Sequence, residues 1–207
     1  MTLEKDKISG TVPRCGKEHR YNRARLYNPF VRFAFLPFGG ESRYRQGFMQ
    51  FAEIRAGERV LDACCGTGTL THRIAEKVGR EGEVIGVDLS TESLAVAESK
   101  KKGAGLPPAF KQASCADLPF PDGYFDLVFS DGWDLARCRC APHAADKLHP
   151  GGWLVADDLE WNPVRSTVEP LIDAGWRVKK KKGPIYCAWD GQPRNTTTAF
   201  LQKPEDA

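Results

Sequence analysis

Two aspartates and a glycine-rich turn are the residues whose types and spacing most clearly indicate chemistry in this 207-residue sequence. Asp62 ends an apolar run and precedes the turn CGTG at 65–68. Glycines let backbone N–H groups approach a ligand closely, and a helix that starts after such a turn offers N–H groups without partners in the helix. Asp88 ends a second apolar run 26 positions after Asp62, and its carboxylate oxygens can accept from both hydroxyls of a ribose. Together these residues indicate a nucleotide site.

The spacing of the glycines narrows the kind of nucleotide. The dinucleotide fingerprint is G-x-G-x-x-G, but after Gly66 and Gly68 the place of the third glycine is taken by Thr71. A nicotinamide-dependent oxidoreductase is therefore disfavoured. Taken alone, the glycine segment is also compatible with a tight turn that binds nothing, and Asp88 with a solvated strand end; the combination favours a ligand.

Alternating strand and helix patterns position these residues. The seven predicted strands cover residues 57–65, 83–90, 108–114, 124–132, 151–158, 176–183 and 196–203. Helices are predicted at 70–79, 91–103, near 144–148 and at 163–175. The last two strands are expected to form an antiparallel pair. This alternation predicts an α/β fold with a single doubly wound, seven-stranded, mostly parallel sheet and helices on both faces.

The chain is expected to contain one folded domain with an N-terminal extension. Residues 1–19 are interpreted as a flexible basic arm, residues 20–52 as an aromatic and basic helical cap with a helix from Glu41 to Phe51, and residues 53–207 as the α/β domain. Nothing is expected to span a membrane, and no secretory signal is recognised. With seven cysteines in no disulfide pattern, a reducing, cytoplasmic location is predicted.

The net charge of +3, from 30 basic and 27 acidic residues, is too balanced to indicate nucleic-acid binding. The aromatic residues of 20–40 alternate with arginines. They are interpreted either as a cover for a lipophilic substrate that touches a membrane surface peripherally, or as ordinary packing of a helix on the domain. The run Lys179–Lys182 is compatible with a phosphate-binding patch or with a charged edge strand.

Four motifs in order, VLDACCGTG, VIGVDLS, LPFPDGYFDLVFS and LHPGGWLVADD, resemble those of class I methyltransferases that use S-adenosylmethionine (SAM). The resemblance is closest to the methyltransferase type 11-like branch with the ubiquinone/menaquinone C-methyltransferases and bacterial phospholipid N-methyltransferases, and it is strong over 55–160. It implies a Rossmann-like fold, SAM as cofactor with S-adenosylhomocysteine as product, and no metal. It also implies in-line methyl transfer to a small or lipid-like acceptor, such as a quinone precursor or a phospholipid head group.

The resemblance also implies residue roles. Asp62 would face the amino group of the SAM methionine, and Asp88 would hold the ribose hydroxyls while Leu89 packs on the adenine. The sequence departs from the family pattern at Cys64, often a glycine, and at Ser114, usually an acid that accepts from the adenine amine. The full set of predicted cofactor-binding residues is Tyr27, Asp62, Ala63, Cys64, Gly66, Thr67, Asp88, Leu89, Ser114, Cys115, Ala116, Ser130 and Asp131.

No residue is assigned a catalytic role from the sequence. Asp131, His143 and Asp157 are candidates for a general base, which a carbon or hydroxyl acceptor needs and an acceptor that ionises easily does not. For each of them a solvated or capping role is the favoured alternative. Asp117 is a weak substitute for the missing acid at position 114.

The cysteines leave two interpretations. Cys64 and Cys65 are interpreted as small buried hydrophobic residues in preference to a redox or metal pair. The spacing of Cys138, Cys140 and His143 differs from the usual zinc pattern, so no metal is predicted, and a thiophilic substrate such as arsenite is only weakly indicated. Two further functions stay open: a SAM-binding enzyme with chemistry other than methyl transfer, and a non-catalytic partner subunit that keeps the fold.

Overall fold

The computed structural model describes residues 49, 52–100, 107–130, 135–157, 159, 162–182, 186–187, 193–194 and 197–206. The predicted arm (1–19) lies outside these residues, as does nearly all of the predicted cap (20–52), including Tyr27. Asp131 and the side chain of Cys138 also lie outside them.

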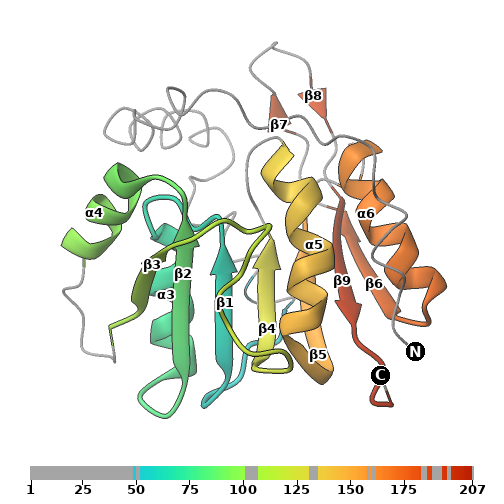
Figure 1. Cartoon of the computed structure of the whole chain (residues 1–207), viewed down its shortest axis with the longest axis horizontal. Helices are drawn as coiled ribbons and strands as arrows, with labels where there is room; N and C mark the ends of the chain where they lie inside the picture. The colour runs from blue at the N-terminus through green and yellow to red at the C-terminus, as the bar shows by residue number, and fades with distance from the viewer. Residues whose placement is uncertain are drawn as a thin grey trace.

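The sheet of the described chain has seven strands in the order β3-β2-β1-β4-β5-β9-β6 (Figure 1). Their bounds are β1 (Arg59–Ala63), β2 (Glu83–Asp88), β3 (Ala109–Gln112), β4 (Phe125–Ser130), β5 (Leu148–Ala156), β6 (Arg177–Lys182) and β9 (Thr197–Gln202). β1 to β5 pair in parallel, whereas β9 is antiparallel to both β5 and β6. The prediction of a doubly wound, mostly parallel, seven-stranded sheet is confirmed.

Helices cover both faces of this sheet (Figure 1). Those of the described chain are α3 (Thr69–Val78), α4 (Thr91–Ser99), α5 (Leu135–Lys147) and α6 (Asn162–Asp173). Successive side chains of β1 point to opposite faces. Val60 packs with Ile74 of α3, while Leu61 and Ala63 belong to the core formed with α5 and α6. α4 lies on the α3 side, where its Ala97 carbonyl is 2.9 Å from His72 Nε2.

Helix α5 is much longer than the short helix predicted near 144–148, so that prediction is wrong. Pro142 has no N–H and normally ends a helix, but here it lies inside α5. The helix continues because its inner face, with Cys140, Ala141, Ala144 and Ala145, is buried against the sheet. Tertiary packing thus outweighs the cost of the proline.

Two other differences from the sequence prediction concern strands. β5 begins at Leu148, three residues before the predicted Gly151, and a register shift follows the pairing of Leu148 with Phe125. A separate hairpin of β7 (Tyr186–Cys187) and β8 (Pro193–Arg194) was not predicted, because two-residue strands are too short to show an alternating pattern.

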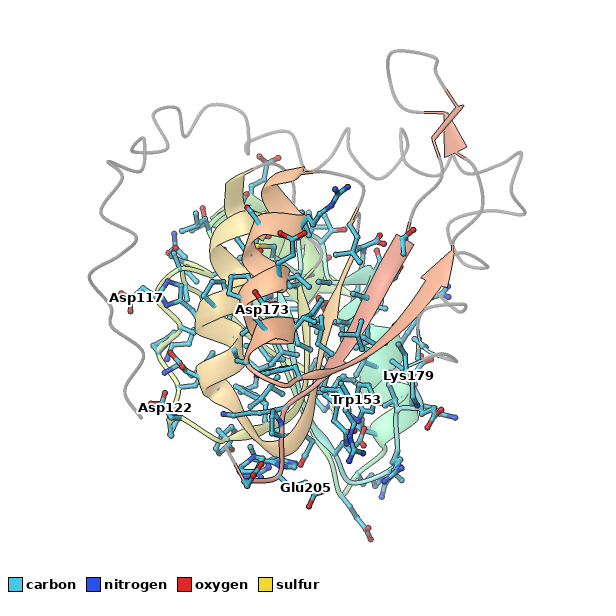
Figure 2. The ribbon with its side chains drawn as sticks, turned by 90° about the vertical axis from the view of Figure 1, so that its right-hand side faces the viewer. Asp117, Asp122, Trp153, Asp173, Lys179 and Glu205 are labelled. Carbon is cyan, nitrogen blue, oxygen red and sulfur yellow. The ribbon has the colours of Figure 1, made fainter. Side chains whose placement is uncertain are left out.

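The lysine-rich strand β6 forms the edge of the sheet beside β9, as predicted for a charged edge strand. Lys179 and Trp153 lie side by side in Figure 2, and Lys179 Nζ is 4.9 Å from the centre of the Trp153 ring. None of the helices in the described ranges is long and apolar enough to cross a membrane.

Candidate active site

The turn between β1 and α3 has an unusual backbone. The φ angles of Cys64, Gly66 and Gly68 are +64°, +54° and +71°. The left-handed region suits glycine but costs other residues energy, so Cys64 is strained where the family often has glycine. The turn is held at Cys65, whose N–H donates to the Val87 carbonyl at 2.9 Å. Gly68 precedes α3 and provides no side-chain cap, so N–H groups of the first turn stay available to a ligand.

The two glycines of this turn have different surroundings. A Cβ atom at Gly66 would meet no heavy atom of the described protein within 4 Å. A Cβ at Gly68 would lie 2.8 Å from Ala97 Cβ and 2.9 Å from Phe110 Cζ. The absence of a side chain at Gly68 therefore permits close packing of the turn on α4 and β3. At Gly66 it leaves open space in which a ligand can contact the protein backbone.

Asp88 ends β2 beside this turn. Its Oδ2 accepts from Gly66 N–H and its Oδ1 from Ser90 N–H, both at 2.8 Å. Burial raises the pKa of the Asp88 carboxyl, and the hydrogen bonds from Ser90 and Gly66 partly offset this effect. A carboxylate offers about four acceptor sites, so Asp88 can still accept from a hydroxyl group in addition to these backbone N–H groups. Leu89, the next residue, is 49% exposed, which is unusual for a leucine and leaves a flat apolar surface free.

Asp62 lies on the α3 side of β1 and is only 3% exposed. Its Oδ2 accepts a hydrogen bond from Thr71 Oγ1 at 2.6 Å. The sequence analysis did not identify Thr71 as a partner. In the sequence, the available signal was a hydroxyl residue shortly after the glycine turn. The structure shows that this residue is fully buried in α3. The contact fixes the Asp62 carboxylate against the helix that follows the glycine turn.

The segment after β3 reaches the same edge of the sheet, because Ala113 N–H donates to the Asp88 carbonyl at 3.2 Å. Ser114 Oγ accepts from the Ala116 N–H at 3.2 Å, so its oxygen is partly used in a local turn. Cys115 is buried, whereas Asp117 is exposed. Nothing in this geometry makes Asp117 a substitute for the missing acid.

The sequence analysis missed the role of Lys100, which contacts the glycine turn. Its Nζ donates to the Thr67 carbonyl at 3.0 Å and lies 3.4 Å from Thr67 Oγ1 and 3.3 Å from Thr69 Oγ1. A lysine directly after α4 thus holds the glycine turn from the side. No sequence signal separated Lys100 from the two lysines that follow it in the sequence.

The candidates for a general base are not all brought together. Ala63, Ser130 and Ala156 are aligned across β1, β4 and β5, so Asp157 follows at the same edge as the glycine turn. Asp157 is 4% exposed and accepts from Thr198 Oγ1 at 2.7 Å. Ser130 is also buried at this edge.

The other two candidates differ from Asp157. His143 is on the exposed side of α5, and Asp131 lies outside the described residues. Within the described ranges, no group of three or more His, Cys, Asp or Glu residues is arranged to hold a metal ion.

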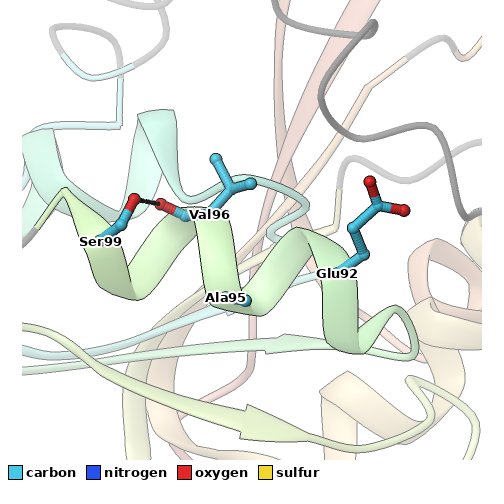
Figure 3. A pocket seen from close by; sticks show the side chains of 4 residues that line it. All are labelled: Glu92, Ala95, Val96 and Ser99. Carbon is cyan, nitrogen blue, oxygen red and sulfur yellow. Dashed lines mark hydrogen bonds between the residues drawn. The ribbon is translucent and has the colours of Figure 1, made fainter.

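A hollow of about 310 Å³ lies elsewhere, on the outer side of α4 (Figure 3). Its described lining is Glu92, Ala95, Val96 and Ser99, and Ser99 Oγ donates to the Val96 carbonyl at 2.7 Å. These residues offer one carboxylate and no convergent set of polar groups. The strand ends that carry the fixed carboxylates of Asp62 and Asp88 are the better candidate.

Comparison with known proteins gives the family of this chain. A family model described as a methyltransferase domain matches residues 60–152. The chain is 37% identical over 155 residues to a demethylmenaquinone methyltransferase of Lactobacillus johnsonii, with 73% of this chain and 62% of that protein covered. It is 38% identical over 177 residues to a 2-phytyl-1,4-naphtoquinone methyltransferase of Synechocystis, with 77% and 73% covered.

A solved structure supports the fold. The YcgJ protein of Bacillus subtilis superposes with a TM-score of 0.61 at 18% identity, and the match covers 80% of this chain and 100% of that one. The chain therefore belongs to the class I SAM-dependent methyltransferases and is related to the menaquinone and phylloquinone methyltransferases. SAM as the cofactor follows from that membership.

Proposed function

We propose that this chain transfers a methyl group from SAM to a small, lipid-like acceptor, with a quinone precursor as the first candidate. The family membership supports methyl transfer. The printed names of two relatives, which refer to demethylmenaquinone and to a phytylated naphthoquinone, support the acceptor class. The chain spans less than two thirds of the length of the Lactobacillus relative, so the acceptor is proposed by analogy with the shared part alone.

The observation that carries the proposal is the pair of carboxylates at the ends of neighbouring parallel strands. Asp62 is aligned with Gly86 of β2, and Asp88 comes two residues further along that strand. The N–H of Gly66 links the turn after β1 to Asp88. Both acids therefore lie at the same ends of neighbouring strands, beside the glycine turn, which suits a ligand with an ammonium group at one end and a ribose at the other.

The residues present fit SAM. Asp62 would hold the ammonium group, Asp88 the ribose hydroxyls and Leu89 the adenine face, while Gly66 leaves room for the cofactor between them. SAM, when bound, supplies the activated methyl group. The protein then contributes orientation and exclusion of water, which are sufficient for a large part of the rate in an in-line displacement.

Asp157 is the described acid that we assign to the acceptor side. Its place after β5 and its hydrogen bond from Thr198 would hold it ready to take a proton from a carbon or hydroxyl acceptor. A peripheral membrane location and a cytoplasmic site of action fit a lipid-like acceptor and are part of the proposal.

Titration calorimetry with S-adenosylhomocysteine tests the cofactor site. Asp88→Ala should weaken binding by more than about tenfold, because hydrogen bonds to a charged group contribute roughly 1.5–3 kcal/mol each. Asp117→Ala is the matched control and should bind like the wild type, since Asp117 is exposed. Equal affinity of the wild type and Asp88→Ala would contradict the proposal.

Incubation of the full chain with methyl-labelled SAM and a cell lipid extract tests the reaction. Label in a lipid-like product is the expected result. Label that stays with the cofactor while another part of SAM is transferred would indicate different chemistry. Activity that appears only after addition of a stoichiometric second chain would indicate a partner subunit.

A further inference from the structure

Three cysteines from three separate segments meet in the core below the glycine turn. Cys64 follows β1, Cys115 follows β3, and Cys140 lies in α5. Cys115 and Cys140 are 5% and 0% exposed and share one hydrophobic core, against which Cys64 packs. All three are free thiols. The proposed methyl transfer uses none of these side chains.

The three sulfur atoms form one hydrogen-bonded cluster. The thiols of Cys140 and Cys64 both donate to the sulfur of Cys115, and these bonds lower the pKa of Cys115 although burial opposes this effect. The hydrogen bond with Cys115 and burial raise the pKa of Cys64 and of Cys140, and a hydrogen bond with Ser130 partly offsets this effect at Cys140. Of the three thiols, Cys115 is therefore the one whose pKa is lowered, and the thiols of Cys64 and Cys140 lie beside it. A thiolate is the form that reacts with oxidants.

Cys65, next to Cys64 in the sequence, points elsewhere. A Cβ atom at Gly86 of β2 would lie 2.9 Å from Cys65 Sγ, so this sulfur occupies the space above Gly86. Its thiol contacts the Gly66 carbonyl at 3.7 Å. Burial raises the pKa of Cys65 further from neutrality. Two adjacent cysteines in one turn thus differ sharply in surroundings, and only Cys64 joins the cluster.

We propose that Cys115 and Cys64 are an oxidation site, at which a peroxide produces a disulfide that closes the cofactor crevice. Cys64 is the partner because it lies in a turn and is partly exposed, whereas Cys140 is fully buried within a helix. The effect on the cofactor rests on the proposed function, but formation of the disulfide does not.

The chemistry balances with hydrogen peroxide as the oxidant. The Cys115 thiolate attacks one peroxide oxygen, an S–O bond forms, the O–O bond breaks, and the departing hydroxide takes a proton from water or solvent acid. The Cys64 thiol then attacks the Cys115 sulfur, the S–S bond forms, and the hydroxyl leaves as water with the Cys64 proton. Two sulfurs lose two electrons in total, and the peroxide is reduced to two molecules of water.

The disulfide would change the crevice because both cysteines belong to segments predicted to bind the cofactor. A disulfide bond is about 2 Å long, which is shorter than a hydrogen bond between two sulfurs. Its formation must therefore draw the glycine turn and the segment at Ser114 toward each other. The oxidised site is then expected to bind the cofactor more weakly, and a bound cofactor is expected to slow formation of the disulfide.

The test treats the full chain with hydrogen peroxide, with and without S-adenosylhomocysteine, and maps disulfides by mass spectrometry of unreduced peptides. The expected product joins Cys64 to Cys115, forms more slowly with the ligand present, and is reversed by dithiothreitol. Oxidised protein should bind S-adenosylhomocysteine roughly tenfold more weakly, the range of a typical coupling between two sites.

Two variants make the assignment specific. Cys64→Ser should abolish the cross-link, and the matched control Cys65→Ser should retain it. Mapping of the wild type decides the pair even if Cys64→Ser fails to fold, because a disulfide between other cysteines would overturn the proposal. A Cys64–Cys115 disulfide without loss of affinity would overturn its control of the crevice. Reduced wild-type protein that binds no cofactor would instead overturn the proposed function.

Discussion

Asp88 accepts a hydrogen bond from the backbone N–H of Gly66 at 2.8 Å, so the end of β2 holds the turn that follows β1. The other oxygen of the same carboxylate accepts from Ser90 N–H. Both oxygens are thus fixed by backbone groups before any ligand arrives. The position of the carboxylate and the shape of the turn therefore depend on each other.

Cofactor binding should weaken at mildly acidic pH. Burial raises the pKa of Asp88, so the carboxylate that would bind the ribose becomes protonated at a higher pH than an exposed aspartate. Titration calorimetry with S-adenosylhomocysteine at several pH values should show affinity falling as the pH drops through the raised pKa. Asp88→Ala should lose this part of the pH dependence, and a wild-type affinity that is flat down to the pKa of a free aspartate would contradict the assignment.

The stability of the ligand-free protein should depend on pH in the opposite direction to cofactor affinity, as far as Asp88 contributes. Because the pKa is higher in the folded than in the unfolded state, the contribution of this group is fully present below the unfolded pKa and is lost as the pH rises through the folded pKa. Urea unfolding of the wild type and Asp88→Ala across this interval isolates the contribution.

Loss of the Thr71 hydroxyl should weaken both the fold and the cofactor site. Thr71→Val keeps the shape of the side chain but leaves the buried Asp62 carboxylate without its 2.6 Å hydrogen bond. A loss of roughly 1.5–3 kcal/mol in the free energy of unfolding is expected, as for other hydrogen bonds to charged groups. Thr71→Ser keeps the hydroxyl and serves as the control, and a Thr71→Val variant that is as stable as the wild type would contradict the role of this hydrogen bond.

Alanine substitutions at Gly66 and Gly68 should separate an effect on cofactor affinity from an effect on the stability of the fold. Gly66→Ala adds a Cβ atom that meets no protein atom, so its cost to the fold is limited to the left-handed backbone, about 1–2 kcal/mol, while cofactor affinity should fall. Gly68→Ala carries the same strain and also places a Cβ within 3 Å of Ala97 and Phe110. Thermal unfolding should therefore show the larger loss for Gly68→Ala, and a reversed order would contradict the contacts described here.

The strain at Cys64 should be measurable without interference from its thiol. Cys64→Ala and Cys64→Gly both remove the sulfur, but only alanine retains a Cβ at a φ of +64°. Cys64→Gly is expected to be more stable by about 1 kcal/mol, after allowance for the greater freedom of glycine in the unfolded chain. Urea denaturation of the two variants checks this, and a more stable alanine variant would mean that the turn relaxes.

The sequence was sufficient to predict the order of strands and helices in the α/β domain, because long apolar periods and glycine stops mark those elements. It also indicated Asp62, Asp88 and Cys64 as cofactor-binding residues, and this assignment stays a prediction. The length of α5 was not predictable by the same rules, since Pro142 is a strong local signal that burial of Cys140, Ala144 and Ala145 overrides.

The contacts that hold the site were not predictable, because they join residues that are distant in sequence or chemically ordinary. Lys100 reaches Thr67 across 33 positions, and nothing local distinguishes it from Lys101. Cys64, Cys115 and Cys140 come together only because the segments after β1 and β3 pack against the same core as the middle of α5. The sequence interpretation of isolated buried cysteines therefore missed the cluster.

The place of β9 between β5 and β6 has a consequence for biosynthesis. β6 emerges from the ribosome before Thr197–Gln202, the strand that joins it to the sheet. Until then the nascent sheet ends at β5, whose unpaired N–H and C=O groups can attract strands of other chains. Slow translation near residue 197, or a stop codon before it, should therefore produce aggregated chains even though every residue of the proposed cofactor site has already been made.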